Sequence, residues 1–167
     1  MQKSQEVIGL SVFHRKSGQK VGVVKDILFD ASQCFMGLLL EDGGWFQRRR
    51  YIPNDNIVSI GRDAVIIEDR KRILPFDEST KDWTGVCSGQ KSLKGQPVLL
   101  TSGHELGIIE NVYFMEEMGT IVGYELSDGW LHDVVEGRKV LKTSEPLIWG
   151  RDACIAREDH VQVQSRN

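Results

Sequence analysis

The feature that most constrains this chain is an internal repeat. The stretch SGQKVGVVKDILFD at residues 17–30 recurs as SGHELGIIENVYFM at residues 102–115, at an offset of 85. Two later anchors follow in the same order: GLLLEDGGW pairs with GYELSDGW, and SIGRDAVII pairs with IWGRDACIA. Matches that keep their order along the chain predict two copies of one structural unit.

Each copy has the pattern of β structure. Short apolar runs are separated by turn residues, and glycines fall inside the predicted strands. Gly18 and Gly103 predict turns that use positive φ. Gly22 and Gly107, inside the long strands, predict a bulge or a tight bend. The pattern predicts an all-β chain made of two small, strongly coiled barrels in tandem.

The repeat divides the chain into four parts. We expect a first barrel at residues 1–70, a linker at 71–91, a second barrel at 92–160 and a tail at 161–167. Units of this size have small cores, so two barrels packed together would share burial.

The linker is too apolar for a free tether, and we expect it to pack on one or both barrels. A short helical turn is expected within it. Another is expected in the second copy, where Leu131, Val134 and Val135 have helical spacing. The apolar residues of the linker are Ile73, Leu74, Phe76 and Trp83.

The charge of the chain is unevenly distributed. The whole chain has a net charge of −3, which argues against a broadly basic nucleic-acid binder. Residues 1–75 hold 12 Lys/Arg and 9 Asp/Glu, whereas residues 76–167 hold 9 and 15. Opposite signs suit association between unlike halves. The alternative is two independently solvated surfaces.

The sequence predicts a cytoplasmic protein. No apolar run approaches the roughly 20 residues that a membrane helix needs, and the first residues lack the pattern of a signal peptide. Cys34, Cys87 and Cys154 form no CxxC motif. We interpret them as buried free thiols in a reducing compartment.

The recurring GRDA sequence predicts a turn that closes the last hairpin of each barrel. We expect Gly61 and Gly150 to supply positive φ, and Asp63 and Asp152 to accept hydrogen bonds from turn amides. The alternative is a pair of Arg/Asp contacts used for docking.

The stretch WFQRRRY at residues 45–51 is the sharpest candidate site, and it has no counterpart in the second copy. Three interpretations are open: a solvated strand with salt bridges, which we favour, a protein-docking face, or a single-stranded nucleic-acid site. In a strand, Arg48 and Arg50 would share one face and Arg49 the other. The predicted partner-binding residues are Trp45, Arg48, Arg50 and Tyr51.

No pattern in the sequence predicts catalysis, a cofactor or a metal site. There is no phosphate-binding glycine loop and no nucleophile with a nearby His/Asp pair. His132 and Asp133 follow Asp128 in a predicted turn, with no third metal ligand at suitable spacing. The acidic stretch MEEMG at residues 115–119 predicts a hairpin tip that could meet the arginine run of a second copy.

The repeated motifs resemble those of the PRC-barrel domain. The resemblance is carried by SGQKVGVVKDILFD, then DGGW, then YIPNDNIVSIGRDAVII in the first copy. In the second copy it is carried by SGHELGIIENVYF, SDGW and IWGRDACIA. The chain looks most like the stand-alone bacterial proteins with two such copies. In the second copy, Asn111 stands where the first has Asp26.

The resemblance implies two tandem six-stranded β-barrels. The family fold also occurs in the cytoplasmic domain of the photosynthetic reaction-centre H subunit. It occurs again in the barrel domain of the ribosome maturation factor. The resemblance implies no catalytic residues, so we expect a non-catalytic protein-binding or adaptor module whose partner is another protein or a second copy. The alternative is an RNA- or ribosome-associated factor; nucleic acid, membrane and metal are the disfavoured partners.

Overall fold

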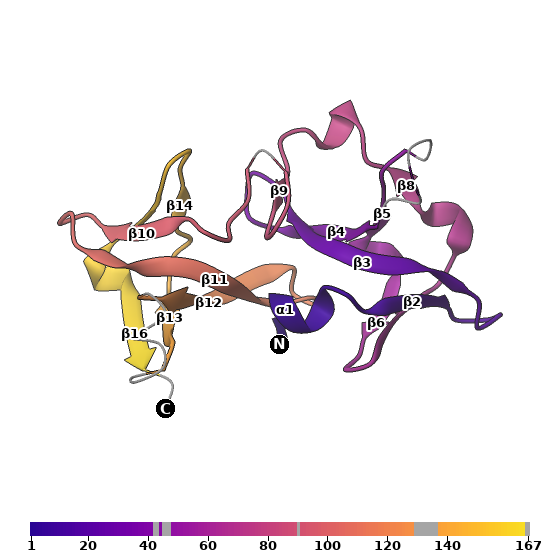
Figure 1. The fold of residues 1–167 in the computed structure, drawn as a ribbon, viewed down its shortest axis with the longest axis horizontal. Helices are drawn as coiled ribbons and strands as arrows, with labels where there is room; N and C mark the ends of the chain where they lie inside the picture. Colours follow the sequence, from indigo (N-terminus) through magenta and orange to yellow (C-terminus); the bar gives the residue numbers. More distant parts are fainter. Residues whose placement is uncertain (42–43, 45–47, 90, 129–136, 166–167) are drawn as a thin grey trace.

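Two curled β-sheets lie side by side along the long axis of the molecule (Figure 1). The computed structural model describes residues 1–41, 44, 48–89, 91–128 and 137–165. Across those residues, no helix combines the length and the apolar character that crossing a membrane requires.

The first sheet follows from the first copy of the repeat. Its order is β6-β7-β2-β3-β4-β5-β8, and β9 pairs with β3 beside this path. The longest strand, β3, contains the repeated apolar run. The strands are β2 (Ser11–His14), β3 (Lys20–Phe29), β4 (Phe35–Leu40), β5 (Arg50–Pro53), β6 (Ile57–Ile60), β7 (Ala64–Ile67), β8 (Leu74–Pro75) and β9 (Thr84–Gly85).

The second sheet has the same arrangement. Its order is β14-β15-β10-β11-β12-β13-β16, and β1 pairs with β11 beside this path. The strands are β1 (Gln2–Lys3), β10 (Pro97–Leu100), β11 (Glu105–Met115), β12 (Thr120–Ser127), β13 (Lys139–Thr143), β14 (Ile148–Trp149), β15 (Cys154–Ala156) and β16 (Val161–Ser165).

The matching strand orders confirm the prediction of two tandem all-β units. Six strands of each sheet, β2–β7 and β10–β15, correspond one to one, and in both sheets the first strand pairs in parallel with the sixth. Each sheet gains two further short strands. Among the described strands, the two ends of each sheet do not pair with each other, so each unit is a curled half-barrel.

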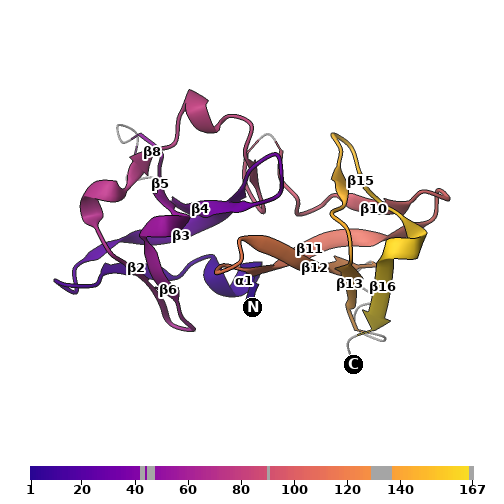
Figure 2. The ribbon, with the colours of Figure 1, turned by 180° about the vertical axis from the view of Figure 1, so that it is seen from behind.

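The two units exchange the segments that precede them. The segment before the first unit, β1 and helix α1 (Ser4–Val7), lies against β11 of the second unit, and its start is seen between the two sheets in Figures 1 and 2. The segment before the second unit contains β9, which pairs with β3 of the first. Each unit therefore depends on a segment that adjoins the other unit in sequence.

Equivalent side chains on the two long strands hold the exchanged segments. Asp26 is fully buried, and its carboxylate accepts hydrogen bonds from the amides of Val86, Cys87 and Ser88 and from the Ser88 hydroxyl at 2.6 Å. Asn111 accepts from the Ser4 hydroxyl at 3.0 Å and the Gln5 amide at 3.1 Å. The motif aspartate is thus a structural anchor.

One hydrophobic core is shared by both units. Phe29 and Phe114, which match in the repeat, meet edge to face with ring centres 5.9 Å apart. Trp149 packs against Phe29, and Phe35 against Phe114. The hairpin tip predicted at residues 115–119 contacts the first unit, since the Phe35 amide donates to the Gly119 carbonyl at 3.0 Å. Sharing the core compensates for the small size of each unit.

The linker and tail are more ordered than predicted. Residues 71–91 pack on the first unit, as expected, and supply β8 and β9 to its sheet. The short helical turn expected in the linker is confirmed by the 3-10 helix η3 (Glu78–Thr80). The remaining described 3-10 helices are η1 (Asn54–Asn56), η2 (Arg70–Arg72) and η4 (Glu158–His160). The description of the C-terminal segment as a tail is wrong, because its strand β16 pairs with β13 over five residues.

The repeated glycines act in two different ways. Gly18 and Gly103 have positive φ, as predicted, and the pairing register shifts beside Gly22 and Gly107, which confirms the bulges. The prediction of positive φ at the two GRDA glycines is wrong. A Cβ on Gly150 would lie 2.5 Å from the Ala153 carbonyl oxygen, and the corresponding distance at Gly61 is 3.3 Å. Close backbone approach explains these glycines.

Other predicted features of the turns and thiols differ from the structure. Asp63 and Asp152 are exposed, and among the described residues no turn amide donates to their carboxylates. Only Cys154 is buried; Cys34 and Cys87 are exposed. The helical turn predicted around Leu131–Val135, and the residues His132 and Asp133, lie outside the described residues.

Candidate functional site

The arginine run singled out by the sequence lies at the start of β5. Trp45 lies outside the described residues. Arg48 and Arg50 are exposed, but only Arg50 belongs to the strand. Tyr51, the fourth predicted binding residue, is 9% exposed and packs inside the chain. The surface that this run offers to a partner therefore comes from Arg48 and Arg50.

Tyr51 belongs to a small apolar cluster on the outer face of the first sheet, away from the shared core. Its ring meets Trp83 edge to face at 5.1 Å and Phe76 at 6.3 Å. Leu28 and Leu39 form the floor of the cluster and are almost fully buried. The linker residues Phe76 and Trp83 thus cover this face of the first unit.

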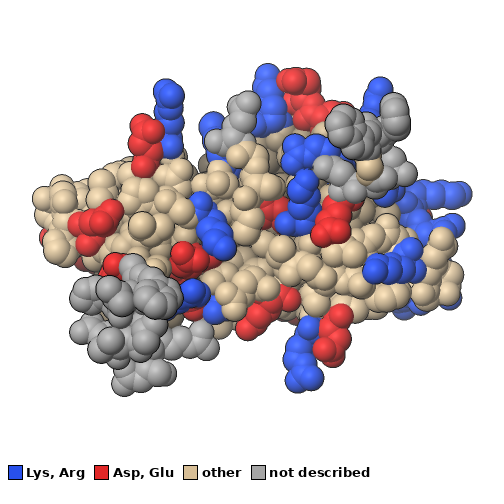
Figure 3. All heavy atoms as spheres, in the orientation of Figure 1, with Lys and Arg blue, Asp and Glu red and all other residues tan. Residues whose placement is uncertain are grey.

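One acidic residue of the linker, Asp77, lies near the arginine run. The Arg49 guanidinium is 5.1 Å from the centre of the Phe76 ring, and the Phe76 amide donates to the Arg49 carbonyl at 2.8 Å. Hydrogen bonds from Ser79, followed by the positive charge of Arg48, lower the pKa of Asp77. Figure 3 shows Lys and Arg side chains gathered over this half, at the right, with acidic residues among them. Opposite charges therefore meet within the chain, between linker and first unit.

Strand register identifies the equivalent face of the second unit. Leu39 pairs with Tyr51 across β4 and β5, and Glu125 pairs with Val140 across β12 and β13. The short exchanged strands align in the same way, which places Met1 where the first unit has Trp83. The equivalent pairs are Leu28 and Tyr113, Met36 and Val122, Leu39 and Glu125, Tyr51 and Val140, Leu74 and Gln164, and Trp83 and Met1.

This face of the second unit is an open groove, called the outer groove below, with a volume of about 270 Å³. Lys142 at its rim is exposed, and no carboxylate of the described residues lies within ion-pair distance of its ammonium. The described residues place no counterpart of Phe76 over the groove. Its lining consists of Met1, Tyr113, Val122, Gly123, Val140, Lys142, Gln164 and Ser165.

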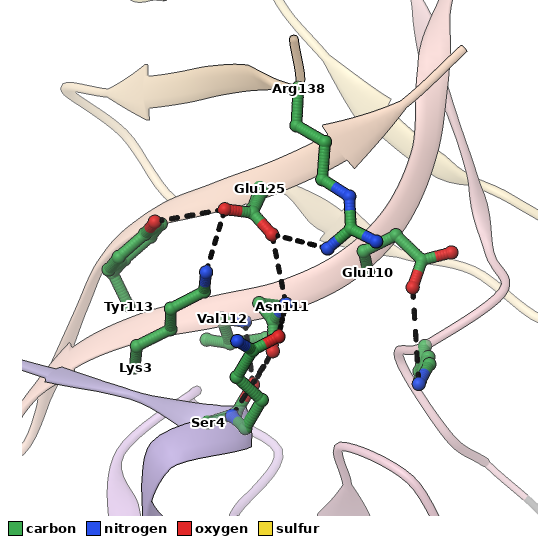
Figure 4. Close-up of polar contacts among 10 residues, drawn as sticks. Lys3, Ser4, Glu110, Asn111, Val112, Tyr113, Glu125 and Arg138 are labelled. Carbon is green, nitrogen blue, oxygen red and sulfur yellow. Dashed lines mark hydrogen bonds and ion pairs between the residues drawn. The ribbon is translucent and has the colours of Figure 1, made fainter. Parts of the chain in front are cut away.

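A buried carboxylate, that of Glu125, is bonded by Tyr113 of the groove lining (Figure 4). Glu125 is 2% exposed, and its oxygens lie 2.9 Å from the Lys3 ammonium and 2.9 Å from the Arg138 guanidinium. The Asn111 amide donates to it at 3.0 Å and the Tyr113 hydroxyl at 3.2 Å. Four donors from three different segments therefore converge on one side chain.

The Glu125 network is built to hold a charge. Burial alone would raise the pKa of Glu125, but the hydrogen bonds from Lys3, Arg138 and Asn111 outweigh burial and lower that pKa to about 2. The carboxylate therefore stays ionised at neutral pH and orders the floor of the groove. Sequence reasoning missed it, although a glutamate in the strand YELS, where the first copy has LLLE, was a usable signal.

The described residues offer no other evident centre for chemistry. Within residues 1–165, leaving aside the undescribed gaps, no three His, Cys, Asp or Glu side chains gather as metal ligands would. Asp26 is buried and saturated with donors, as its anchoring role requires.

Two comparisons with known proteins bear on the identity of the fold. Residues 2–74 match the family model of the PRC-barrel domain. The chain is also 26% identical over 145 residues to the "Uncharacterized protein YrrD" of Bacillus subtilis (strain 168), covering 86% of this chain and 79% of that protein. An alignment of this length includes both repeats. The resemblance seen in the sequence is confirmed: residues 2–74 belong to the PRC-barrel domain family, and the second unit repeats their strand order.

Proposed function

We propose that this chain is a non-catalytic protein-binding module and that its second unit carries the docking surface. The observation that supports this proposal is the covering of the first unit. There, the outer face of the sheet already holds an extended segment of the chain's own linker.

The covered face displays the binding chemistry that a partner would use. Strand addition supplies main-chain hydrogen bonds, as β8 pairs with β5 and β9 with β3. Aromatic packing of Phe76 and Trp83 on Tyr51 supplies buried area. Among the described residues, none covers the outer groove of the second unit as Phe76 and Trp83 cover the equivalent face of the first.

The test is affinity capture from the native host with a matched pair of variants. Val122→Asp/Lys142→Glu alters the outer groove. Val58→Asp/Lys20→Glu makes the same changes on exposed parts of the first unit. We expect proteins captured by the wild type and the control to be lost from the groove variant, and one of them to bind the purified chain directly.

The alternative partner is ribosomal RNA, through the exposed Arg48 and Arg50. Salt-sensitive co-sedimentation with ribosomes that is lost in Arg48→Ala/Arg50→Ala, but retained in the groove variant, would overturn the proposal. Equal capture of the same proteins by the groove variant and the wild type would also overturn it.

A further inference from the structure

The outer groove also carries an indication of what it binds. Resting on the proposed function, we infer that it takes an acidic peptide segment with aromatic side chains from a partner protein. The segment would bind as residues 74–84 of this chain bind the equivalent face of the first unit.

The first argument is the correspondence of the two faces. The register places Val140 where Tyr51 lies, Val122 where Met36 lies, and Tyr113 where Leu28 lies. In the first unit these positions are covered by two aromatic rings from one segment. A groove with an apolar lining at the equivalent positions suits apolar side chains of a bound segment.

The second argument is charge complementarity. The segment that covers the first unit, PFDESTKDW, has three carboxylates and one lysine. Arginines flank its binding site there. On the second unit, Lys142 stands on the rim where the first unit has the uncharged Pro53. Its ammonium has no carboxylate partner among the described residues and is available to an acidic ligand.

The third argument is an ordered arginine at the equivalent place. Arg138 precedes Val140 by two positions, as Arg49 precedes Tyr51. Arg49 lies over the Phe76 ring. The bond from Arg138 to Glu125 orders its guanidinium, and 41% of this side chain is exposed. The sequence spacing thus places a cation at the position in the second unit that corresponds to Arg49 in the first.

The test uses the chain's own linker sequence as a probe. A fluorescein-labelled peptide with the sequence of residues 73–85, ILPFDESTKDWTG, is titrated with the full chain and followed by fluorescence anisotropy. We expect saturable binding that weakens about tenfold when the peptide phenylalanine is replaced by alanine. Lys142→Glu in the protein should weaken it about three- to tenfold, whereas Lys20→Glu should not change it.

Mapping by NMR completes the test. Amide shifts at Tyr113, Gly123 and Val140 support the inference. Shifts confined to Leu39 and Tyr51 would mean that the peptide displaces the chain's own linker, and they would overturn it. Absence of saturable binding, or groove-dependent self-association seen by sedimentation without peptide, would overturn it as well.

The two experiments fail separately. If the groove variant loses captured proteins but the peptide does not bind, the proposed function stands and the acidic aromatic ligand is wrong. If the peptide binds but no captured protein depends on the groove, the site exists and the proposed function is wrong.

Discussion

Replacing Glu125 by glutamine tests whether a buried charge orders the floor of the outer groove. The substitution keeps the size of the side chain and removes its charge. Lys3, whose side chain is 12% exposed, would lose the carboxylate that it bonds, whereas Arg138 could turn towards water. Loss of one member of a buried ion pair is costly because the other charge stays desolvated.

The magnitude follows from the pKa of the carboxylate. Its ordinary value is 4.5 and its value in the folded chain is about 2, a difference that corresponds to roughly 3 kcal/mol. Because the folded-state pKa is lowered, this stability is fully present above about pH 4.5 and is lost as the pH falls towards 2. We therefore expect Glu125→Gln to lower the free energy of unfolding by about 2–3 kcal/mol at pH 7.

The assay is urea unfolding of both proteins, followed by circular dichroism between pH 2.5 and 8. The difference between wild type and variant should be constant above pH 5 and then close as the pH falls. Glu105→Gln, at an exposed position of the same β11 strand, is the control and should have little effect at any pH. A difference that is absent at pH 7, or that does not change with pH, would refute the reasoning.

Three further predictions concern stability and are measured by chemical or thermal unfolding. Asp26→Asn should cost about 2–4 kcal/mol, because at the buried Asp26 position an amide nitrogen would face the Ser88 donors; an unchanged stability would contradict the anchoring role. Gly150→Ala should destabilise by about 1–3 kcal/mol and more than Gly61→Ala, since its Cβ would lie closer to a carbonyl oxygen; the reverse order would exclude close approach as the cause. Trp83→Ala should cost about 2–3 kcal/mol and expose Tyr51 to solvent. If a soluble quencher already reaches the Tyr51 ring in the wild type, Trp83 does not cover that ring.

The strands and the repeat could be predicted because their signals are local. Turn glycines, apolar runs and the ordered matches between the copies each lie within a few residues of what they determine. Gly18 and Gly103 illustrate this, since the turn that each forms can be predicted from the residues beside it. The all-β class and the two-unit organisation follow from such signals alone.

The segment exchange could not be predicted, because its partners are far apart in sequence. β1 is two residues long and pairs with a strand more than 100 positions away. The pairs Asp26 with Ser88 and Asn111 with Ser4 are likewise distant. The contact between Arg49 and the Phe76 ring of the linker is also distant in sequence, and no local pattern predicts it.

The difference between the two outer faces explains how one of them can remain open. The first unit has Leu28 and Leu39 there, an apolar floor that is stable because the linker covers it. An uncovered floor of that kind would expose leucines to water. The second unit has Tyr113 and Glu125 at these positions, and Lys3 from the exchanged segment bonds the carboxylate. Hydrogen bonds and ion pairs thus order this floor in the described part of the second unit, whereas in the first unit the linker covers a floor of leucines.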